Sequence, residues 1–435
     1  MDKPNRKFAL PFFLTLAVLT VVSAIVPLRP TISYGENRDL AAFPDFSWSS
    51  LMSGDYFDDI SLWFSDTFPG REGWIGVSQS LSSLHGYSEI AIAGPLDTME
   101  APVEEDIPTP ATAPTGAAAD GAATSATEQT VPTIPNVELA DVHIGKAIQI
   151  GDAGYNQLSI SPRMCDRYAK TLAGFGQRMA QEGVRVISAP APTSIGIMVD
   201  RELLPQLNCT PQDEILERMH SQMGDDVLTV DTVGKLLEHR DEYLFYRTDH
   251  HWSALGAYYA YQAVCEAAGM EPAALEDMQY LNQGEMIGSI YGKVPYPRRL
   301  KRDEMESWIP QGNITMYRSE TTFGEFPLIR DVSNQKAEGK YAAFLGSDTP
   351  VVHIVNEDLP DAPNCLVVKD SFGNCFVPYL SQNYHNVWAI DYRKYWDRSM
   401  ADFVRHFDVD DVIVAPYLIA TQDGNANDWF ATHFR

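Results

Sequence analysis

Basic residues are scarce in this sequence, and their scarcity excludes two kinds of partner. The chain has 32 Lys and Arg against 59 Asp and Glu, which gives a formal net charge of −27. Binding to nucleic acid requires a basic face that neutralises phosphates, and docking of a folded body on anionic lipid requires one as well. We therefore expect no nucleic-acid partner, and we interpret the acidic balance as a contribution to solubility.

Cysteine is sparse too. The chain has five cysteines in 435 residues, and none of them belongs to a Cys-x-x-Cys pair. Such closely spaced pairs are the pattern by which zinc sites and redox dithiols are recognised in a sequence. The sequence therefore predicts no metal and no cofactor, and the odd number of cysteines leaves at least one thiol free.

A long apolar run lies near the N-terminus, over residues 8–28, and basic residues precede it. A run of this length can cross a bilayer as a helix, and a basic flank is typical of the cytoplasmic side. We interpret residues 1–30 as a cytoplasmic tip and an uncleaved anchor, which makes the protein single-pass in the cell membrane. A cleaved signal peptide is the alternative, with residues 22–24 as its cleavage site. Both interpretations give an exported, extracytoplasmic body.

Composition divides the rest of the chain into three parts. Residues 31–98 are expected to be ordered, to bury aromatic side chains and to pack on the catalytic domain. This segment contains three tryptophans, Trp48, Trp63 and Trp74. Residues 99–136 are rich in Ala, Thr and Pro without any apolar period, so we expect a disordered insertion there. Residues 137–435 form the catalytic domain, with a β-rich insertion over residues 283–360.

Helices and strands alternate in this last part. A hairpin is predicted over residues 144–152 with its turn at Gly151. Predicted helices cover residues 162–181, 214–223, 253–268, 372–381 and 394–406, and predicted strands cover residues 184–190, 227–231, 365–369, 386–390 and 412–415. Such alternation predicts an α/β fold with a mostly parallel sheet covered on both faces. Catalytic groups in such sheets lie after the carboxyl ends of the strands.

Two junctions carry residues of catalytic type. The first follows the aromatic run of residues 243–246 and contains Asp249, His250 and His251, and the second contains Ser371 between a predicted strand and helix. A serine nucleophile needs a base, and the base needs an orienting acid. We predict that Ser371, His251 and Asp249 fill these roles. Backbone N–H groups at the start of the second helix can stabilise an oxyanion.

The spacing also indicates alternatives for the same residues. Asp249 and His251 are two apart, so on an extended segment they point to one side and His250 to the other, which makes His250 the second choice of base. Ser371 has a structural alternative as a helix N-cap. The paired histidines have two alternatives: they form structural hydrogen bonds, or they bind a metal ion as in a metal-dependent hydrolase. Trp252 is expected to pack rather than to react.

The signature residues resemble a known family. Residues 246–252 (YRTDHHW) and 368–374 (VKDSFGN) resemble those of the bacterial DHHW family, which is similar to the SGNH-hydrolase-like proteins of alginate O-acetylation. The resemblance implies an SGNH-hydrolase-like three-layer fold with Ser371 as nucleophile, His251 as base and Asp249 as orienting acid. Here the acid and base precede the serine, unlike the order in ordinary SGNH enzymes. Lys369 stands near a position where many SGNH enzymes carry glycine.

Further residues are candidates for substrate or oxyanion contact. They are His250, Asn374, Arg393, Tyr291 and Tyr392. Arg393 would bind a carboxylate or hydroxyl of a polymer and the tyrosines would stack on it; the alternatives are an ion pair for Arg393 and packing for the tyrosines.

The function expected from the resemblance is O-acetyl transfer to a cell-surface polysaccharide through an acyl-serine, with a multi-spanning membrane acyltransferase as partner. A carbohydrate acetylesterase with the same triad and a non-catalytic polysaccharide-binding or assembly protein remain alternatives.

Overall fold

The computed structural model describes residues 32–33, 38–39, 41–44, 46–48, 51, 55–68, 90–93, 147–319 and 324–435. Contacts divide the chain into two compact units, Met1–Tyr87 and Ser88–Arg435. The predicted anchor and the Ala/Thr/Pro-rich segment both lie outside the described residues. Among the helices that are described, none combines the length and the apolar character needed to span a bilayer.

The described residues of the first unit include a two-stranded ribbon and a helix. β1 (Ile32–Ser33) pairs antiparallel with β2 (Arg38–Asp39), and α3 covers Asp55–Asp66. Phe43 packs edge-on against Trp63 with ring centroids 4.8 Å apart. Trp48, by contrast, is 74% exposed, so the expectation that it is buried is wrong. Trp74 lies outside the described residues.

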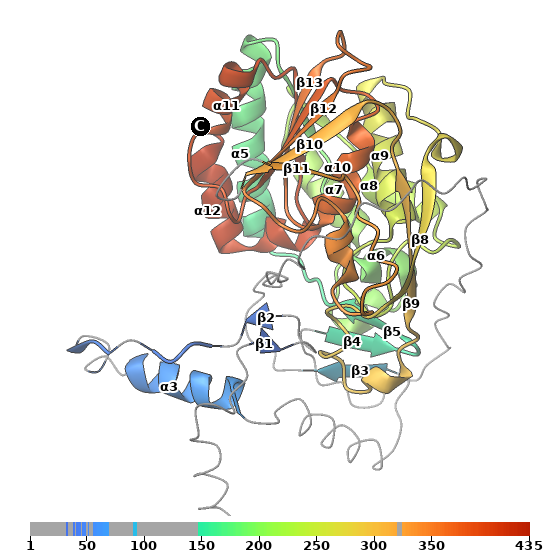
Figure 1. Ribbon diagram of the computed structural model, residues 1–435. Coiled ribbons are helices and arrows are strands. Elements are labelled where there is room, and N and C mark those ends of the chain that lie inside the picture. The colour runs from blue at the N-terminus through green and yellow to red at the C-terminus, as the bar shows by residue number, and fades with distance from the viewer. Residues whose placement is uncertain are drawn as a thin grey trace, which may run out of the picture. The chain divides into compact units, whose positions relative to one another are not determined.

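The centre of the second unit is an eight-stranded sheet in the order β11-β10-β12-β14-β13-β15-β6-β7 (Figure 1). The five strands from β14 to β7 run parallel, and the other three join antiparallel at one edge. Their bounds are β6 Arg185–Ser188, β7 Val227–Thr229, β10 Ile314–Ser319, β11 Gly324–Phe326, β12 Val351–Asn356, β13 Asn364–Lys369, β14 Asn386–Asp391 and β15 Asp411–Ala415. The fold is therefore mixed α/β with a mostly parallel central sheet, as the alternating pattern predicts.

Helices cover both faces of this sheet. Figure 1 shows α5, α11 and α12 on one side and α9 and α10 on the other. The helices are α5 Pro162–Gln181, α6 Ser194–Met198, α7 Gln212–His220, α8 Thr232–Glu238, α9 Ala254–Ala268, α10 Phe372–Leu380, α11 Met400–Phe407 and α12 Gly424–His433. Short 3₁₀ turns lie at Leu204–Leu207, Leu275–Asp277, Pro297–Arg299, Lys340–Ala343 and Leu418–Gln422. Because β13 is covered on both sides, its residues from Cys365 to Lys369 are all 0% exposed.

Local signals account for several helix boundaries. Pro162 opens α5, as its position after Ser161 predicts. Ser253 caps α9 through its hydroxyl, which accepts a hydrogen bond from Gly256 N, and Gly269 ends the helix at φ 70°. The predicted helix over residues 394–406 begins too early, because the capping hydroxyl of Ser399 starts α11 only at Met400.

The β-rich region is only partly a separate feature. β8 (Gln279–Met286) pairs antiparallel with β9 (Asp303–Ile309) away from the central sheet. β10, β11 and β12 instead extend the central sheet, so half of the predicted insertion is part of the main fold. Another small sheet joins β3 (Ile90–Ala93), β4 (Ala147–Ile150) and β5 (Ala153–Asn156), and its last turn is at Gly151, as predicted, with φ 58°.

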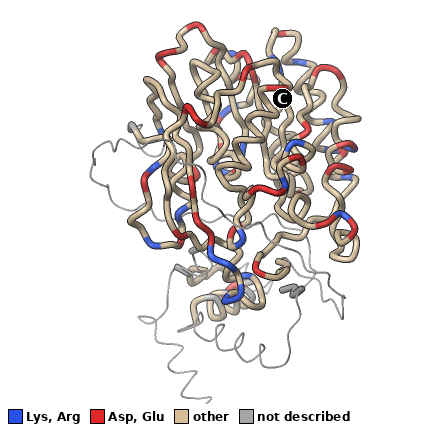
Figure 2. The backbone as a smooth tube through the Cα atoms, turned by 90° about the vertical axis from the view of Figure 1, so that its right-hand side faces the viewer, with Lys and Arg blue, Asp and Glu red and all other residues tan. Residues whose placement is uncertain are grey.

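All five cysteines are free and buried. Burial raises the pKa of the Cys365 and Cys375 thiols well above the ordinary value, which makes them unreactive. Acidic residues are spread over many elements of the described chain, with fewer basic residues between them (Figure 2).

Strand register brings the predicted nucleophile to one edge of the sheet. Lys369 at the end of β13 pairs with Asp391 on β14 and with Ala415 on β15. Because these strands are parallel, the segments that follow them leave the sheet at the same edge. Ser371 and Arg393 therefore both lie just beyond the carboxyl ends of neighbouring strands.

Candidate active site

The loop that carries Asp249 and His251 is closed by backbone contacts between its own two ends. Phe245 and Trp252 form an isolated antiparallel bridge, and Ser253 N donates to Leu244 O at 2.8 Å. Residues 247–251 are therefore the tip of a tight hairpin-like loop that leads into α9. The aromatic run before this junction pairs at this single bridge and forms no strand of a sheet.

Ser371, His251 and Asp249 meet in one hydrogen-bonded line. Ser371 Oγ lies 2.7 Å from His251 Nε2, and His251 Nδ1 lies 2.5 Å from Asp249 Oδ1. A carboxylate only accepts, so the ring proton of His251 faces Asp249 and Nε2 is left to accept from the serine. Ser371 occupies the N-cap position of α10, yet its side chain makes no capping hydrogen bond. The Ser371 hydroxyl therefore does not act as a helix cap.

The acid of this line is held in the ionised form. Burial by itself raises the pKa of Asp249, but the neighbouring His251 and His250 and the donated hydrogen bonds lower it further than burial raises it, so the net shift is downward. Oδ1 accepts from the His251 backbone N–H at 3.0 Å, and Oδ2 accepts from the Ser289 N–H at 2.8 Å. These contacts fix the direction of the carboxylate as well as its charge.

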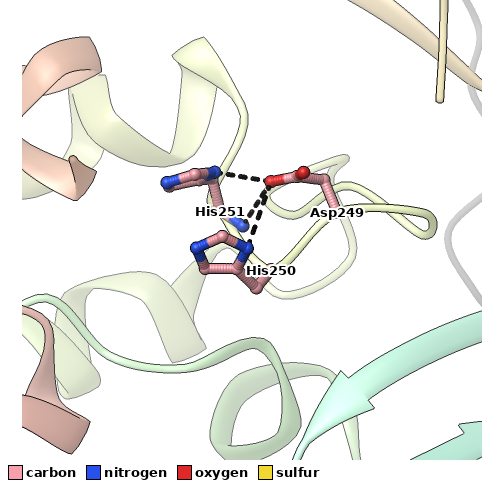
Figure 3. A group of neighbouring side chains, drawn as sticks. All are labelled: Asp249, His250 and His251. Carbon is pink, nitrogen blue, oxygen red and sulfur yellow. Dashed lines mark hydrogen bonds and ion pairs between the residues drawn. The ribbon is translucent and has the colours of Figure 1, made fainter. Parts of the chain in front are cut away.

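His250 does not point away from the acid as the alternating pattern predicts. Its ring lies beside that of His251 with centroids 3.9 Å apart, and its Nδ1 is 3.7 Å from Asp249 Oδ1 (Figure 3). The same Nδ1 lies 2.6 Å from Ser289 Oγ. Residues 248–251 form a tight turn, so the two-residue period of an extended strand does not apply.

A segment after β8 wraps around the acid. Gly288 N donates to Thr248 Oγ1 at 3.0 Å, and Ile290 N donates to Thr248 O at 2.9 Å. A Cβ atom on Gly288 would lie 2.2 Å from the Cβ of Asp249, so only glycine fits there without displacement. Tyr291, predicted to stack on substrate, packs half-buried against a small cluster that includes Ile290.

Asp303 on β9 supports the loop from the other side, and the sequence reasoning missed it. Its carboxylate accepts from the backbone N–H of Arg247 at 2.7 Å and of Thr248 at 2.9 Å, and from the hydroxyls of Tyr243 and Thr248. Burial raises the pKa of Asp303 despite these bonds. In the sequence it is one acidic residue in an alternating strand, more than fifty positions away, with no local signal of this contact.

Two aromatic residues join the histidine loop to the serine. Trp252 Nε1 donates to Phe372 O at 3.0 Å, so its packing role includes a bond to the residue after the nucleophile. The ring of Tyr341 stacks on His251 at 3.7 Å and 7°, and its hydroxyl donates to Ser371 O at 3.1 Å. Tyr341 was not foreseen either, because it lies in a short 3₁₀ turn without a recognisable motif.

The start of α10 has fewer available donors than expected. Asp370 Oδ1 accepts from Phe372 N at 3.1 Å, and Asp370 O accepts from Gly373 N at 3.0 Å. Asp370 Oδ2 accepts from Tyr417 N at 2.6 Å. The expectation that the first helical N–H groups bind an oxyanion therefore does not hold for Phe372 and Gly373, since both are already bonded.

Asn374 and Arg393 belong to a compact network of charges. Asn374 Oδ1 accepts from the fully buried Lys369 Nζ at 2.5 Å, and its Nδ2 donates to Asp348 Oδ1 at 2.6 Å. Arg393 Nη2 lies 2.7 Å from Asp348 Oδ2 and 2.6 Å from Asp391 Oδ2. The Arg393 guanidinium therefore forms ion pairs within the protein, which is the alternative to contact with a substrate.

Tyr392 packs in the protein interior, which is the alternative to stacking on a substrate. It is 6% exposed, and its ring lies 5.1 Å from Phe430 and 5.8 Å from Trp429 on α12. These contacts place the ring in the core between the sheet and α12 rather than on a surface that a polymer can reach.

The sequence profile of the DHHW protein family matches residues 36–108 and 123–390. The chain belongs to the DHHW family. The matched range contains both the histidine loop and the nucleophile junction, and its internal gap falls in the Ala/Thr/Pro-rich segment. No curated protein matches the sequence.

Solved structures share the fold. A DHHW family protein from Eubacterium siraeum superposes with a TM-score of 0.58 at 23% identity, over 66% of this chain and 94% of that one. PatB1 from Bacillus cereus does so with a TM-score of 0.55 at 18% identity, over 64% and 96% of the two chains. A second PatB1 structure, which has a sulfonyl adduct, gives a TM-score of 0.53 at 16% identity, over 64% and 97%.

Proposed function

We propose that this protein is an O-acetyltransferase that modifies a cell-surface polysaccharide through an acyl-serine. The observation that carries the proposal is the unbroken line from Ser371 Oγ through both ring nitrogens of His251 to Asp249, with separations of 2.7 and 2.5 Å. In this proposal Ser371 is the nucleophile, His251 the general base and acid, and Asp249 the group that orients and stabilises the ring.

The reaction proceeds in two balanced halves. Ser371 Oγ attacks the acetyl carbonyl carbon while His251 Nε2 takes the serine proton, and His251 then returns that proton to the departing oxygen of the donor. In the second half a sugar hydroxyl attacks the acetyl carbon of the acetyl-serine and His251 takes its proton. The bond from the acetyl carbon to Ser371 Oγ then breaks, and His251 returns the proton to Ser371 Oγ. Asp249 stays ionised throughout, because its pKa is lowered in this environment.

Acetyl transfer is favoured over other acyl chemistry by the resemblance of the signature residues to the proteins of alginate O-acetylation. An acetylesterase shares the first half-reaction and differs only in that water resolves the acyl-enzyme. A non-catalytic polysaccharide-binding protein would keep the fold without a reactive serine. Of these three functions we propose transfer to a sugar hydroxyl. The reaction products distinguish the transferase from the esterase.

Of the further candidates, His250 and Asn374 are proposed to face the bound substrate. Asn374 N donates to Ser371 O at 3.0 Å, so its side chain starts beside the nucleophile, and Nδ2 carries a second proton beyond the one donated to Asp348. Arg393 and the two tyrosines are proposed to hold surrounding elements in place.

We also propose that the protein acts outside the cytoplasm. Residues 8–28 serve as the anchor, residues 99–136 as a spacer, and a multi-spanning membrane acyltransferase supplies the acetyl groups. The anchor is tested by mass spectrometry of the mature N-terminus in purified membranes. A mature chain that begins near residue 25 would contradict it.

Covalent labelling tests the nucleophile directly. One PatB1 structure has a sulfonyl adduct, which makes a sulfonyl fluoride a suitable probe for this fold. We expect phenylmethylsulfonyl fluoride to add one sulfonyl group at Ser371, found by peptide mass spectrometry, and to abolish release of p-nitrophenol from its acetate. Ser371→Ala should remove labelling, and His251→Ala should slow acetate turnover roughly 10³-fold or more.

Ser221→Ala is the matched control, because Ser221 is exposed and its hydroxyl donates to Arg218 O near the end of α7. It should retain full labelling and turnover. Wild-type turnover in both Ser371→Ala and His251→Ala would refute the triad. With an oligosaccharide acceptor present, an acetylated sugar product supports transfer, and free acetate alone supports the esterase.

A further inference from the structure

The side chains of Asp249, His250 and His251 form a cluster of a kind that binds transition metals. One ligand atom from each lies within 4.8 Å of the others, and all three residues are buried, with 4–6% of their surface exposed. Figure 3 shows the Nδ1 atoms of both rings turned towards the same carboxylate oxygen. Two imidazole nitrogens and one carboxylate oxygen are a ligand set that suits Zn²⁺.

We infer that these three residues bind a divalent transition-metal cation such as Zn²⁺, and that binding switches off the triad. The inhibitory effect rests on the proposed function, because the residue that the ion blocks is the proposed catalytic base, His251. The cation is therefore an inhibitor of this site and takes no part in the reaction.

The distances between the donor atoms are close to those that a tetrahedral ion requires. With metal–ligand bonds of about 2.0 Å, the ligand atoms of a tetrahedral site are about 3.3 Å apart. Asp249 Oδ1 is 2.5 Å from His251 Nδ1 and 3.7 Å from His250 Nδ1. One separation must open by roughly 0.8 Å and the other close by roughly 0.4 Å, which small side-chain rotations supply.

The surroundings already support a metal-bound arrangement. Asp249 Oδ2 accepts from the Ser289 N–H at 2.8 Å, so the carboxylate keeps its orientation when Oδ1 is given to an ion. Such bonds to the outer atoms of ligands orient metal sites generally. The hydroxyl of Ser289, 2.6 Å from His250 Nδ1, or a water molecule fills the fourth position.

Metal binding moves one proton and thereby removes the base. In the active arrangement the His251 proton is on Nδ1, facing Asp249, and Nε2 accepts from Ser371 Oγ at 2.7 Å. An ion on Nδ1 transfers that proton to Nε2, with no proton gained or lost overall. The ring then donates to Ser371 Oγ, the serine keeps its own proton, and attack on an acyl group stops.

Direct binding tests the inference without any use of activity. The purified full-length chain is titrated with Zn²⁺ by calorimetry and with Co²⁺, whose visible absorption reports tetrahedral nitrogen and oxygen ligands. We expect one equivalent bound, with the affinity falling at least 10-fold in His250→Gln and in His251→Gln. Ser371→Ala should bind normally, because Ser371 is not a ligand. Mg²⁺ should not compete, since it prefers octahedral oxygen sites.

His239→Gln is the matched control, because His239 lies at the end of α8 and pairs with Glu242 instead. It should bind like the wild type, and circular dichroism melting verifies that each variant is folded. In a second readout Zn²⁺ should slow sulfonyl labelling of Ser371 at least 10-fold, and EDTA should restore it.

The possible outcomes separate the two proposals. Absence of binding to the wild type, or equal binding by the wild type and both histidine variants, overturns the metal site. Loss of turnover on treatment with EDTA overturns the inhibitory role, since the ion would then be required for the reaction. A Ser371 that is never labelled, with Zn²⁺ bound through the two histidines, refutes the proposed nucleophile and leaves the metal site standing.

Discussion

Gly288→Ala disturbs the acid of the triad without changing any residue of the triad. A Cβ at this position would lie 2.2 Å from the Cβ and Oδ2 of Asp249 and 2.5 Å from its Cγ. Carbon atoms in contact are about 3.5 Å apart or more, so the carboxylate or the wrapping segment must move by roughly 1.3 Å, the difference between 3.5 and 2.2. A shift of that size separates Asp249 from His251 beyond hydrogen-bond range.

The effect on activity should be large and the effect on stability moderate. Misplacement by about 1 Å can cost roughly 10²-fold in rate, so we expect turnover of p-nitrophenyl acetate and sulfonyl labelling to fall by about that factor. Overpacking of a buried site typically costs about 1–3 kcal/mol, measured here by denaturant unfolding. Activity and unfolding together distinguish two causes: a folded variant with low activity has a displaced Asp249, whereas an unfolded variant loses both activity and the unfolding transition.

Gly174→Ala provides the same chemical change where the structure has space. Its nearest neighbour to an added Cβ is Arg178 Nη1 at 3.7 Å, an ordinary contact on α5. We expect full activity and up to about 1 kcal/mol of added stability, as alanine replaces glycine inside a helix. Should Gly288→Ala match the wild type in both labelling and unfolding, Asp249 does not sit against Gly288 and the geometry of the acid is refuted.

Two further substitutions test contacts that the sequence did not indicate. Tyr341→Phe removes the hydrogen bond to Ser371 O but keeps the ring stacked on His251. The free energy of unfolding should therefore fall by about 1 kcal/mol, and labelling of Ser371 should fall less than 10-fold. An unchanged free energy of unfolding would argue against this hydrogen bond. Asp391→Asn removes one of the two carboxylates that Arg393 and the buried Lys369 share, leaving only Asp348, and should lower stability by about 3–5 kcal/mol at neutral pH. Burial alone raises the pKa of Asp391, but the two cations lower it below the ordinary value near 3.9, so its contribution is present above that pH and is lost as the pH falls further. The difference in stability between wild type and Asp391→Asn should therefore shrink below about pH 4, and a difference that grows there would refute this reasoning.

The elements of this protein follow from short-range signals. The start of α5 at Pro162, the cap and end of α9 at Ser253 and Gly269, and the turn at Gly151 can each be predicted from a few neighbouring residues. Alternation of helices and strands likewise predicts a parallel sheet, and the sheet order then brings Ser371 to its carboxyl edge. The start of α11 was misplaced because the capping residue is Ser399, five residues after the predicted start at Lys394.

The sequence alone identified Ser371, His251 and Asp249 as candidates, because their residue types and their positions at two junctions are local properties. Only the tertiary structure decided which groups surround them. Gly288 and Tyr341 contact the triad from segments some 30 to 90 residues away, and no periodicity or cap records such a contact. The direction of His250 was likewise a matter of tertiary structure, since a tight turn replaced the extended backbone that the alternation rule assumes.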